Sequence, residues 1–149
     1  MYAKLLVPLD GSERAEAILP HVESLAKRYR AEVIFLFVEE PPLMLEYDEV
    51  VDPDNLEKLI ADQRREIQAY FDALVNRWRA KEFDARVRYR SGPVIRTIID
   101  TAQRENVDLV AMASHGRSGL MRAFYGSVAA GVLNQIDRPL LLVRSRRSG

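Results

Sequence analysis

The stretch Leu5-Leu6-Val7-Pro8-Leu9-Asp10-Gly11-Ser12 decides the fold class of this chain. Apart from the proline, residues 5–9 are uninterrupted aliphatic side chains, a pattern typical of a strand that is buried on both faces of a parallel sheet. Residues 10–12 then combine turn formers with a hydroxyl that can cap the start of a helix. The stretch therefore predicts a buried strand that leads through a tight turn into a helix.

The same alternation of strand and helix continues to the end of the chain. The expected strands after residues 5–9 cover residues 32–38, 85–90, 107–113 and 140–143. The expected helices, in which apolar residues recur at helical spacing, cover residues 15–30, 56–78, 94–102 and 127–136. Because strands that are apolar on both faces need helices on both sides, we expect an α/β three-layer sandwich with a five-stranded parallel sheet, folded as a single domain of residues 1–149.

Two segments depart from this regular pattern. Pro20 interrupts the helical spacing of residues 15–30 and predicts a kink, because a proline in a helix interior leaves the carbonyl of Glu16 without its N–H partner. Residues 39–55 contain three prolines and an acidic stretch. We expect a loop there with one short helical turn, and this loop is the candidate lid.

Arginine alternates with other residues in one predicted strand. Arg86, Arg88 and Arg90 are separated by Val87 and Tyr89, which predicts a strand with one solvated face at the edge of the sheet. The alternative is a patch that binds the phosphate backbone of a nucleic acid. The formal net charge of zero and the lack of an interleaved aromatic platform favour the solvated edge.

Composition excludes several classes of protein. The 149 residues contain 22 Lys and Arg against 22 Asp and Glu, which argues against a basic nucleic-acid binder. The absence of cysteine excludes a disulfide scaffold and a thiolate metal site and favours the cytoplasm, and two histidines are too few for a typical zinc site. The longest apolar run among the strands, residues 33–38, is far shorter than the ~20 residues of a membrane span.

Candidate functional residues follow the first, second and fourth predicted strands, because ligands of open parallel sheets bind beyond the carboxyl ends of the strands. These residues are Asp10, Val38 with Glu39, and residues 112–127. The Asp10 carboxylate can hold a ribose hydroxyl, a metal or a base edge. It can equally well be a structural turn residue.

The most informative stretch is Ala113-Ser114-His115-Gly116-Arg117-Ser118-Gly119, followed by Gly126-Ser127 at a predicted helix start. Small residues allow a backbone to approach a phosphate, and the first N–H groups of the helix, at residues 126–128, can hold phosphate oxygens. Arg117 and Ser118 would add a positive charge and a hydrogen-bond donor. The alternative is a strand-to-helix connection that needs only flexible residues, with Ser127 as the N-cap. The spacing slightly favours nucleotide binding.

Other nucleotide and phosphate chemistries lack their signatures. No Gly-Lys-Ser/Thr loop and no glycine fingerprint follow the first strand, which disfavours a P-loop hydrolase and a dinucleotide dehydrogenase. A phosphorelay receiver would need paired acids, a phosphoacceptor aspartate and a lysine, where this chain has Asp10 alone, Ser91-Gly92 and Arg144. His115 has no carboxylate near it in sequence to orient it, so an exposed loop histidine is favoured over a general acid or base.

At this point the chain resembles the universal stress protein family over nearly its whole length. The resemblance is carried by residues 6–12, 32–38, 91–93 and 108–112. Nucleotide-binding members of that family carry a glycine, two residues, a second glycine, nine residues, and then Gly-Ser or Gly-Thr. Here Gly116 is the second glycine, Gly126-Ser127 is the final pair, and Ala113 replaces the first glycine. A methyl group at that position fits a negative backbone φ but would crowd a ribose at a positive one.

The resemblance implies a Rossmann-like fold of the adenine nucleotide alpha hydrolase type, with strand order 3-2-1-4-5 and bound ATP. Asp10 and the backbone of Pro8 and Val38 would meet the adenosine, and Met112 and Ala113 would line the ribose side. A Mg²⁺ ion would be held mainly by the phosphates. The residues around the phosphates would be His115, Gly116, Arg117, Ser118, Gly119, Gly126, Ser127 and Val128.

The resemblance also implies a homodimer whose last strands pair antiparallel, through Leu140, Leu141, Leu142 and Val143. Bound nucleotide would set the conformation or the partner preference of this dimer, with ATP hydrolysis very slow at most and no catalytic or metal-binding residue. One rival is a family member that binds no nucleotide and serves as an interaction module. The other is an enzyme that activates a substrate by adenylation, for which His115 or Asp10 would have to act.

Overall fold

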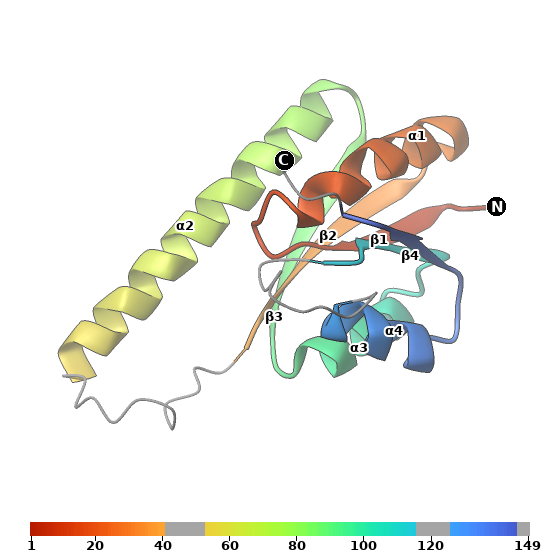
Figure 1. Cartoon of the computed structure of the whole chain (residues 1–149). Helices are drawn as coiled ribbons and strands as arrows, with labels where there is room; N and C mark the ends of the chain where they lie inside the picture. The colour runs from red at the N-terminus through yellow and green to blue at the C-terminus, as the bar shows by residue number, and fades with distance from the viewer. Residues whose placement is uncertain (41–52, 116–125, 146–149) are drawn as a thin grey trace.

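The computed structural model describes residues 1–40, 53–115 and 126–145, and within them one parallel sheet runs through the molecule (Figure 1). Its strand order is β3-β2-β1-β4-β5, which confirms the predicted fold class and order. The strands are β1 (Lys4–Pro8), β2 (Glu32–Glu39), β3 (Asp84–Ser91), β4 (Leu109–Ala113) and β5 (Leu140–Val143). The helices are a 3₁₀ turn (Ala15–Ile18), α1 (Leu19–Tyr29), α2 (Pro53–Ala80), α3 (Val94–Arg104) and α4 (Ser127–Gln135).

Helices cover both faces of the sheet, as Figure 1 shows. α1 and α2 lie on one face, and α3 and α4 lie on the other. Successive strand residues point to opposite faces, so Val7 and Phe35 join the core under α1 and α2, whereas Leu6 and Ile34 join the core under α3 and α4. This alternation also decides on which face each residue at a strand end lies.

Pro20 is accommodated differently from the prediction. The chain forms the 3₁₀ turn first and then starts α1 at Leu19, so Pro20 occupies the first turn of α1, where it needs no N–H partner. The Glu16 carbonyl accepts the N–H of Leu19 instead. The prediction that Pro20 lies in a helix interior and leaves the Glu16 carbonyl without a partner is therefore wrong.

The predicted loop of residues 39–55 is also shorter than expected at both ends. Glu39 belongs to β2, where it pairs with Ser91 of β3, and Pro53 is the first residue of α2. Residues 41–52, on which the candidate lid was placed, lie outside the described residues. Among the helices of residues 1–40, 53–115 and 126–145, none is long and apolar enough to cross a membrane.

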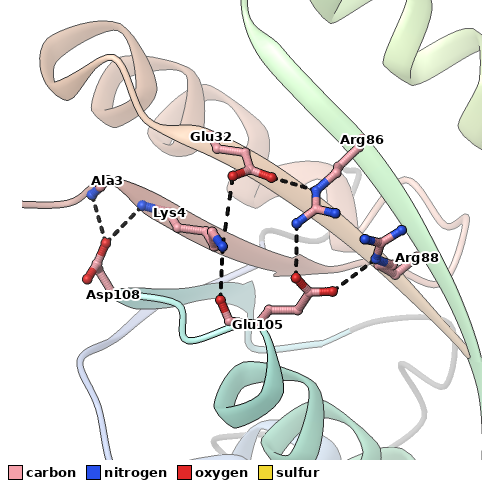
Figure 2. A network of polar contacts seen from close by, with 7 residues as sticks. All are labelled: Ala3, Lys4, Glu32, Arg86, Arg88, Glu105 and Asp108. Carbon is pink, nitrogen blue, oxygen red and sulfur yellow. Dashed lines mark hydrogen bonds and ion pairs between the residues drawn. The ribbon is translucent and has the colours of Figure 1, made fainter.

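The arginine face of edge strand β3 is neutralised by acidic side chains rather than simply solvated (Figure 2). Arg86 Nε lies 2.5 Å from Glu32 of β2, and its Nη2 lies 2.9 Å from Glu105, which follows α3. Arg88 Nε also contacts Glu105 at 2.9 Å. Because these guanidinium groups are paired within the chain, the face is a poor candidate for a nucleic-acid patch.

A second part of this network holds the start of β1 (Figure 2). Asp108 Oδ2 accepts the backbone N–H groups of Ala3 and Lys4 at 2.8 and 2.9 Å, and Lys4 Nζ donates to the carbonyl of Glu105 at 3.0 Å. The polar contacts at this amino-terminal edge therefore tie β1, β2, β3 and α3 together, on the side of the sheet away from the strands' carboxyl ends.

We predict that Glu105→Gln lowers the free energy of unfolding by about 1–2 kcal/mol at neutral pH, because Glu105 accepts from two guanidinium groups. The hydrogen bond from Arg88 is the largest cause that lowers the pKa of Glu105 from its ordinary value of 4.5. A carboxyl whose pKa is lower in the folded than in the unfolded chain stabilises the fold at a pH above its unfolded pKa. This stabilisation is lost as the pH falls through the folded pKa.

The difference between wild type and Glu105→Gln should therefore shrink as the pH falls below about 4.5 in urea titrations at several pH values. Asp62→Asn is the control, because Asp62 pairs with Arg65 on the exposed surface of α2 and should change stability little. An equal loss in the two variants, or a pH-independent difference, would contradict this account.

Candidate functional site

Three of the predicted site residues form an apolar wall at the carboxyl edge of the sheet. Met112 is buried in the core under α3 and α4, and Val38 and Val128 pack against the same core. Pro8 follows Val7, which points to the opposite face, so its ring lies on the α3–α4 side too. Adjacent strands β2, β1 and β4 and the start of α4 thus contribute to one surface.

The start of α4 lies directly beside this wall. Gly126 is the N-cap residue, with extended backbone at φ −62° and ψ 155°, and among residues 1–40, 53–115 and 126–145 no side-chain hydrogen bond caps the helix. Ser127 is the first helical residue and is exposed, so its expected position as the N-cap is wrong, while the alternative of a simple strand-to-helix connection is not tested. The first N–H groups of an uncapped helix need a partner outside the helix, and with the helix dipole they favour an anion.

Gly126 is required by a close approach between two backbone segments. Its N–H donates to the Ser114 carbonyl at 2.9 Å, just after β4. A Cβ at residue 126 would lie 2.6 Å from that carbonyl oxygen. Because the φ of Gly126 is negative, space rather than backbone conformation excludes a side chain here. The glycine thus lets α4 begin against the end of β4.

His115 belongs to a network of hydroxyl groups that the sequence did not reveal. Its Nδ1 lies 3.0 Å from Ser114 Oγ, which accepts the backbone N–H of Ser145 at 3.2 Å. Ser145 Oγ lies 3.1 Å from the carbonyls of both Arg14 and His115. His115 is partly buried, so it differs from the exposed loop histidine that was favoured. No sequence signal distinguished Ser145.

Asp10 has the structural role that one of the two readings predicted. Its Oδ1 accepts the N–H of Ser12 at 2.9 Å across Gly11, whose φ of 86° favours glycine. An added Cβ at Gly11 would approach Ile67 of α2 at 3.2 Å, so the turn lies under α2. A ligand role for Asp10 stays a prediction.

Tyr70 of α2 lies close to the same turn. Its hydroxyl donates to the Glu16 carboxylate. Burial is the largest cause that raises the pKa of Tyr70 above its ordinary range, followed by the hydrogen bond and charge of Glu16, with the carboxylate of Asp10 contributing as well. The Tyr70 hydroxyl therefore stays protonated and anchors α2 over the turn after β1.

Ala113 needs no glycine-like backbone. It is the last residue of β4, pairs with Val143, and is absent from the non-glycine residues with positive φ in the described chain. Its methyl group lies on the face opposite to Met112, as do Leu109 and Ala111. The alternative in which the methyl group would crowd a ribose because of a positive φ is therefore excluded.

Four of the predicted site residues lie outside the described chain. They are Gly116, Arg117, Ser118 and Gly119. In the part of the chain that the structure describes, no three His, Cys, Asp or Glu side chains gather as a metal site.

A cavity of about 330 Å³ that the sequence did not predict lies between α2 and the ends of β2 and β3. It is lined by Phe37, Tyr89 and Ile67, with the Glu39–Arg64 ion pair at 2.8 Å beside them. The hydrogen bond from Arg64 lowers the pKa of Glu39, so this pair stays ionised. Phe37 packs on the α2 side of the sheet, whereas the wall faces α4.

The wall and the helix start beside it lie beyond the carboxyl ends of the strands, which is where open α/β sheets bind their ligands. The family model described as the universal stress protein family matches residues 1–144. The chain therefore belongs to the universal stress protein family.

Individual relatives agree with this assignment. Universal stress protein MJ0577 of Methanocaldococcus jannaschii is 28% identical over 166 residues, covering 99% of this chain and 98% of the relative. The solved structure of hypothetical protein MJ0577 superposes with a TM-score of 0.86 at 27% identity, covering 99% of both chains.

Two solved structures with adenine nucleotides share the fold at lower identity. One is a universal stress protein in complex with cAMP, 18% identical with a TM-score of 0.69, covering 97% of this chain and 98% of that one. The other is the universal stress protein family protein At3g01520 of Arabidopsis thaliana with AMP bound, 13% identical with a TM-score of 0.69, covering 97% and 93%.

We predict that Gly126→Ala lowers the free energy of unfolding by about 1–3 kcal/mol, because the new methyl group overlaps the Ser114 carbonyl. Ser127→Ala is the control, since Ser127 is exposed and caps nothing. Chemical denaturation of the three proteins measures the difference. A Gly126→Ala protein as stable as wild type would show that this close approach does not constrain the fold.

Proposed function

We propose that this protein binds an adenine nucleotide, ATP in the first instance, at the carboxyl edge of the sheet, and that the bound nucleotide regulates a dimer. The observation that carries the proposal is the apolar wall of Val38, Met112 and Val128 beside the uncapped start of α4. The family assignment supports it, as do relatives of the same fold that contain cAMP and AMP.

The residues at this edge suit both the adenosine and the phosphates of a nucleotide. An adenosine needs apolar surface for its flat base, which the wall supplies together with Pro8, and Asp10 lies at the neighbouring turn. Phosphates need N–H donors and positive potential, which the first turn of α4 supplies. We place the phosphates against His115, Gly126, Ser127 and Val128, and we extend the site to Gly116, Arg117, Ser118 and Gly119. A bound Mg²⁺ would be held mainly by the phosphates.

A regulatory role is proposed rather than catalysis. Nδ1 of His115 lies 3.0 Å from the hydroxyl of Ser114, and a hydroxyl does not strengthen a ring base as a carboxylate would. Because the sequence of residues 113–128 contains no lysine and no acidic residue, ATP hydrolysis should be very slow at most. Incubation with ATP, followed for ADP and pyrophosphate, tests this part. Rapid turnover abolished by His115→Ala would favour an enzyme.

We predict that Ser127→Glu weakens ATP binding at least about tenfold, because the new carboxylate would repel the phosphates at the start of α4. The same substitution should leave stability equal or slightly higher, since an acidic residue in the first helical turn is favourable. Ser127→Gln is the matched control, because it has the same shape without the charge.

Titration calorimetry with ATP measures the affinities, and thermal denaturation without nucleotide measures stability. This pair of variants avoids Gly126, where any side chain would also disturb the backbone. Equal ATP affinity in the Glu and Gln variants would contradict a phosphate site at α4. A wild type that binds no ATP up to about millimolar concentration would favour the interaction module.

We also propose a homodimer through β5. This strand is at the edge of the sheet, and its four residues are only partly buried. The carbonyl of Pro139 accepts from Val110 of β4, and that of Val143 accepts from Ser114, which follows β4, so by alternation the N–H and C=O groups of Leu140 and Leu142 point away from β4. An apolar edge with such groups is favourable for pairing with a second copy.

We predict that Leu142→Pro converts the dimer to a monomer, because proline removes an outward N–H without removing a hydrogen bond to β4. Leu142→Ala is the matched control: it loses the same side chain but keeps the N–H, and it should remain dimeric. Light scattering coupled to size exclusion measures the mass. A wild-type monomer at high concentration, or a Leu142→Pro dimer, would exclude this interface.

A further inference from the structure

The ring of His115 is oriented by contacts on two sides. Nδ1 faces Ser114 Oγ at 3.0 Å. The Cδ2 atom, on the opposite side of the ring and bonded to Nε2, lies 3.7 Å from the position that a Cβ of Gly126 would take. The Cδ2 edge of the ring, to which Nε2 is bonded, is therefore the edge that lies beside Gly126.

We propose that Ser114 and Ser145 are positioning residues that hold neutral His115 as an Nε2–H donor beside the first turn of α4. The use of this donor toward a phosphate rests on the proposed function, but the state of the ring does not. Ser145 lies 30 residues from His115 along the chain, and no motif connects the two.

The single hydrogen of the Ser114 hydroxyl determines which tautomer of His115 is favoured. Ser114 Oγ accepts the N–H of Ser145 at 3.2 Å, and Ser114 is only 3% exposed, so its own hydrogen needs an acceptor inside the protein. Nδ1 of His115 is such an acceptor at 3.0 Å. If Nδ1 accepts, the proton of the neutral ring is on Nε2. If Nδ1 carried the proton instead, Ser114 Oγ would accept from both Nδ1 and the Ser145 N–H. Its own buried hydrogen would then lose Nδ1 as an acceptor, which is unfavourable.

Ser145 holds the backbone on which the ring stands. Its hydroxyl has one hydrogen and lies 3.1 Å from each of two carbonyls, those of Arg14 and His115, so it bridges them with a shared hydrogen bond. Ser145 is 8% exposed, so water competes little for this hydrogen. Through this bridge the end of β5 and the turn after β1 both restrain His115.

The state of the ring is read directly by ¹⁵N–¹H spectra of the histidine side chains at a pH where the rings are neutral. The chain has only two histidines, and exposed His21 is an internal reference that should exchange between both tautomers. We expect wild-type His115 to be held in the Nε2–H form, and Ser114→Ala to show a mixture like that of His21. An Nδ1–H ring in wild type, or the same mixture in both proteins, would overturn the proposal.

Nucleotide affinity provides a second readout. We expect Ser145→Ala to bind ATP about five- to tenfold more weakly than wild type, Ser145→Thr to restore binding by keeping the hydroxyl, and Ser24→Ala on the exposed face of α1 to change nothing. Wild-type affinity in Ser145→Ala, or a Ser145→Thr protein as weak as Ser145→Ala, would contradict the role of Ser145.

The two hypotheses can fail separately. If wild type holds the Nε2–H form but binds no ATP, the positioning role stands and the proposed function is wrong. The wild-type ring spectrum decides the tautomer even if Ser114→Ala does not fold.

Discussion

The arrangement of the site depends on the backbone of one residue, Ser114. Its N–H donates to Val143 of β5 at 2.7 Å, and its carbonyl accepts the N–H of Gly126 at 2.9 Å. Because Ser114 is buried, neither group can exchange its partner for water without cost. These two hydrogen bonds place the start of α4 at the end of β4, and they connect the proposed nucleotide site to the strand through which we propose that two copies pair.

The fold was predictable because its strands are apolar on both faces. This pattern requires helices on both sides of the sheet, and the resemblance supplied the strand order. The errors in the predicted helix boundaries occurred at prolines, because a proline in a sequence is compatible with a helix start, a helix kink or a loop. Pro20 and Pro53 both lie in the first turn of a helix, where proline fits well, but the sequence was interpreted as a helix interior and a loop.

The candidate site was predictable only in part, and for different reasons at different residues. Val38, Met112 and Val128 were implied by the resemblance, and strand alternation explains why they share a face. The reason for glycine at residue 126 was not predictable, because it depends on the carbonyl of Ser114, which another element contributes. The role of Ser145 was likewise inaccessible, since hydrogen bonds between distant segments leave no local pattern in the sequence.

The central claim is that a nucleotide binds between the wall and the start of α4. The most direct test is an NMR titration with ATP, in which the chemical shifts of the backbone amides of all helices and strands are followed together. The account predicts saturable shifts at Val38, at Met112 and at residues 126–128, with little change on α2. Shifts confined to the cavity beside Phe37 and Arg64, or no saturable shift at any amide, would contradict it.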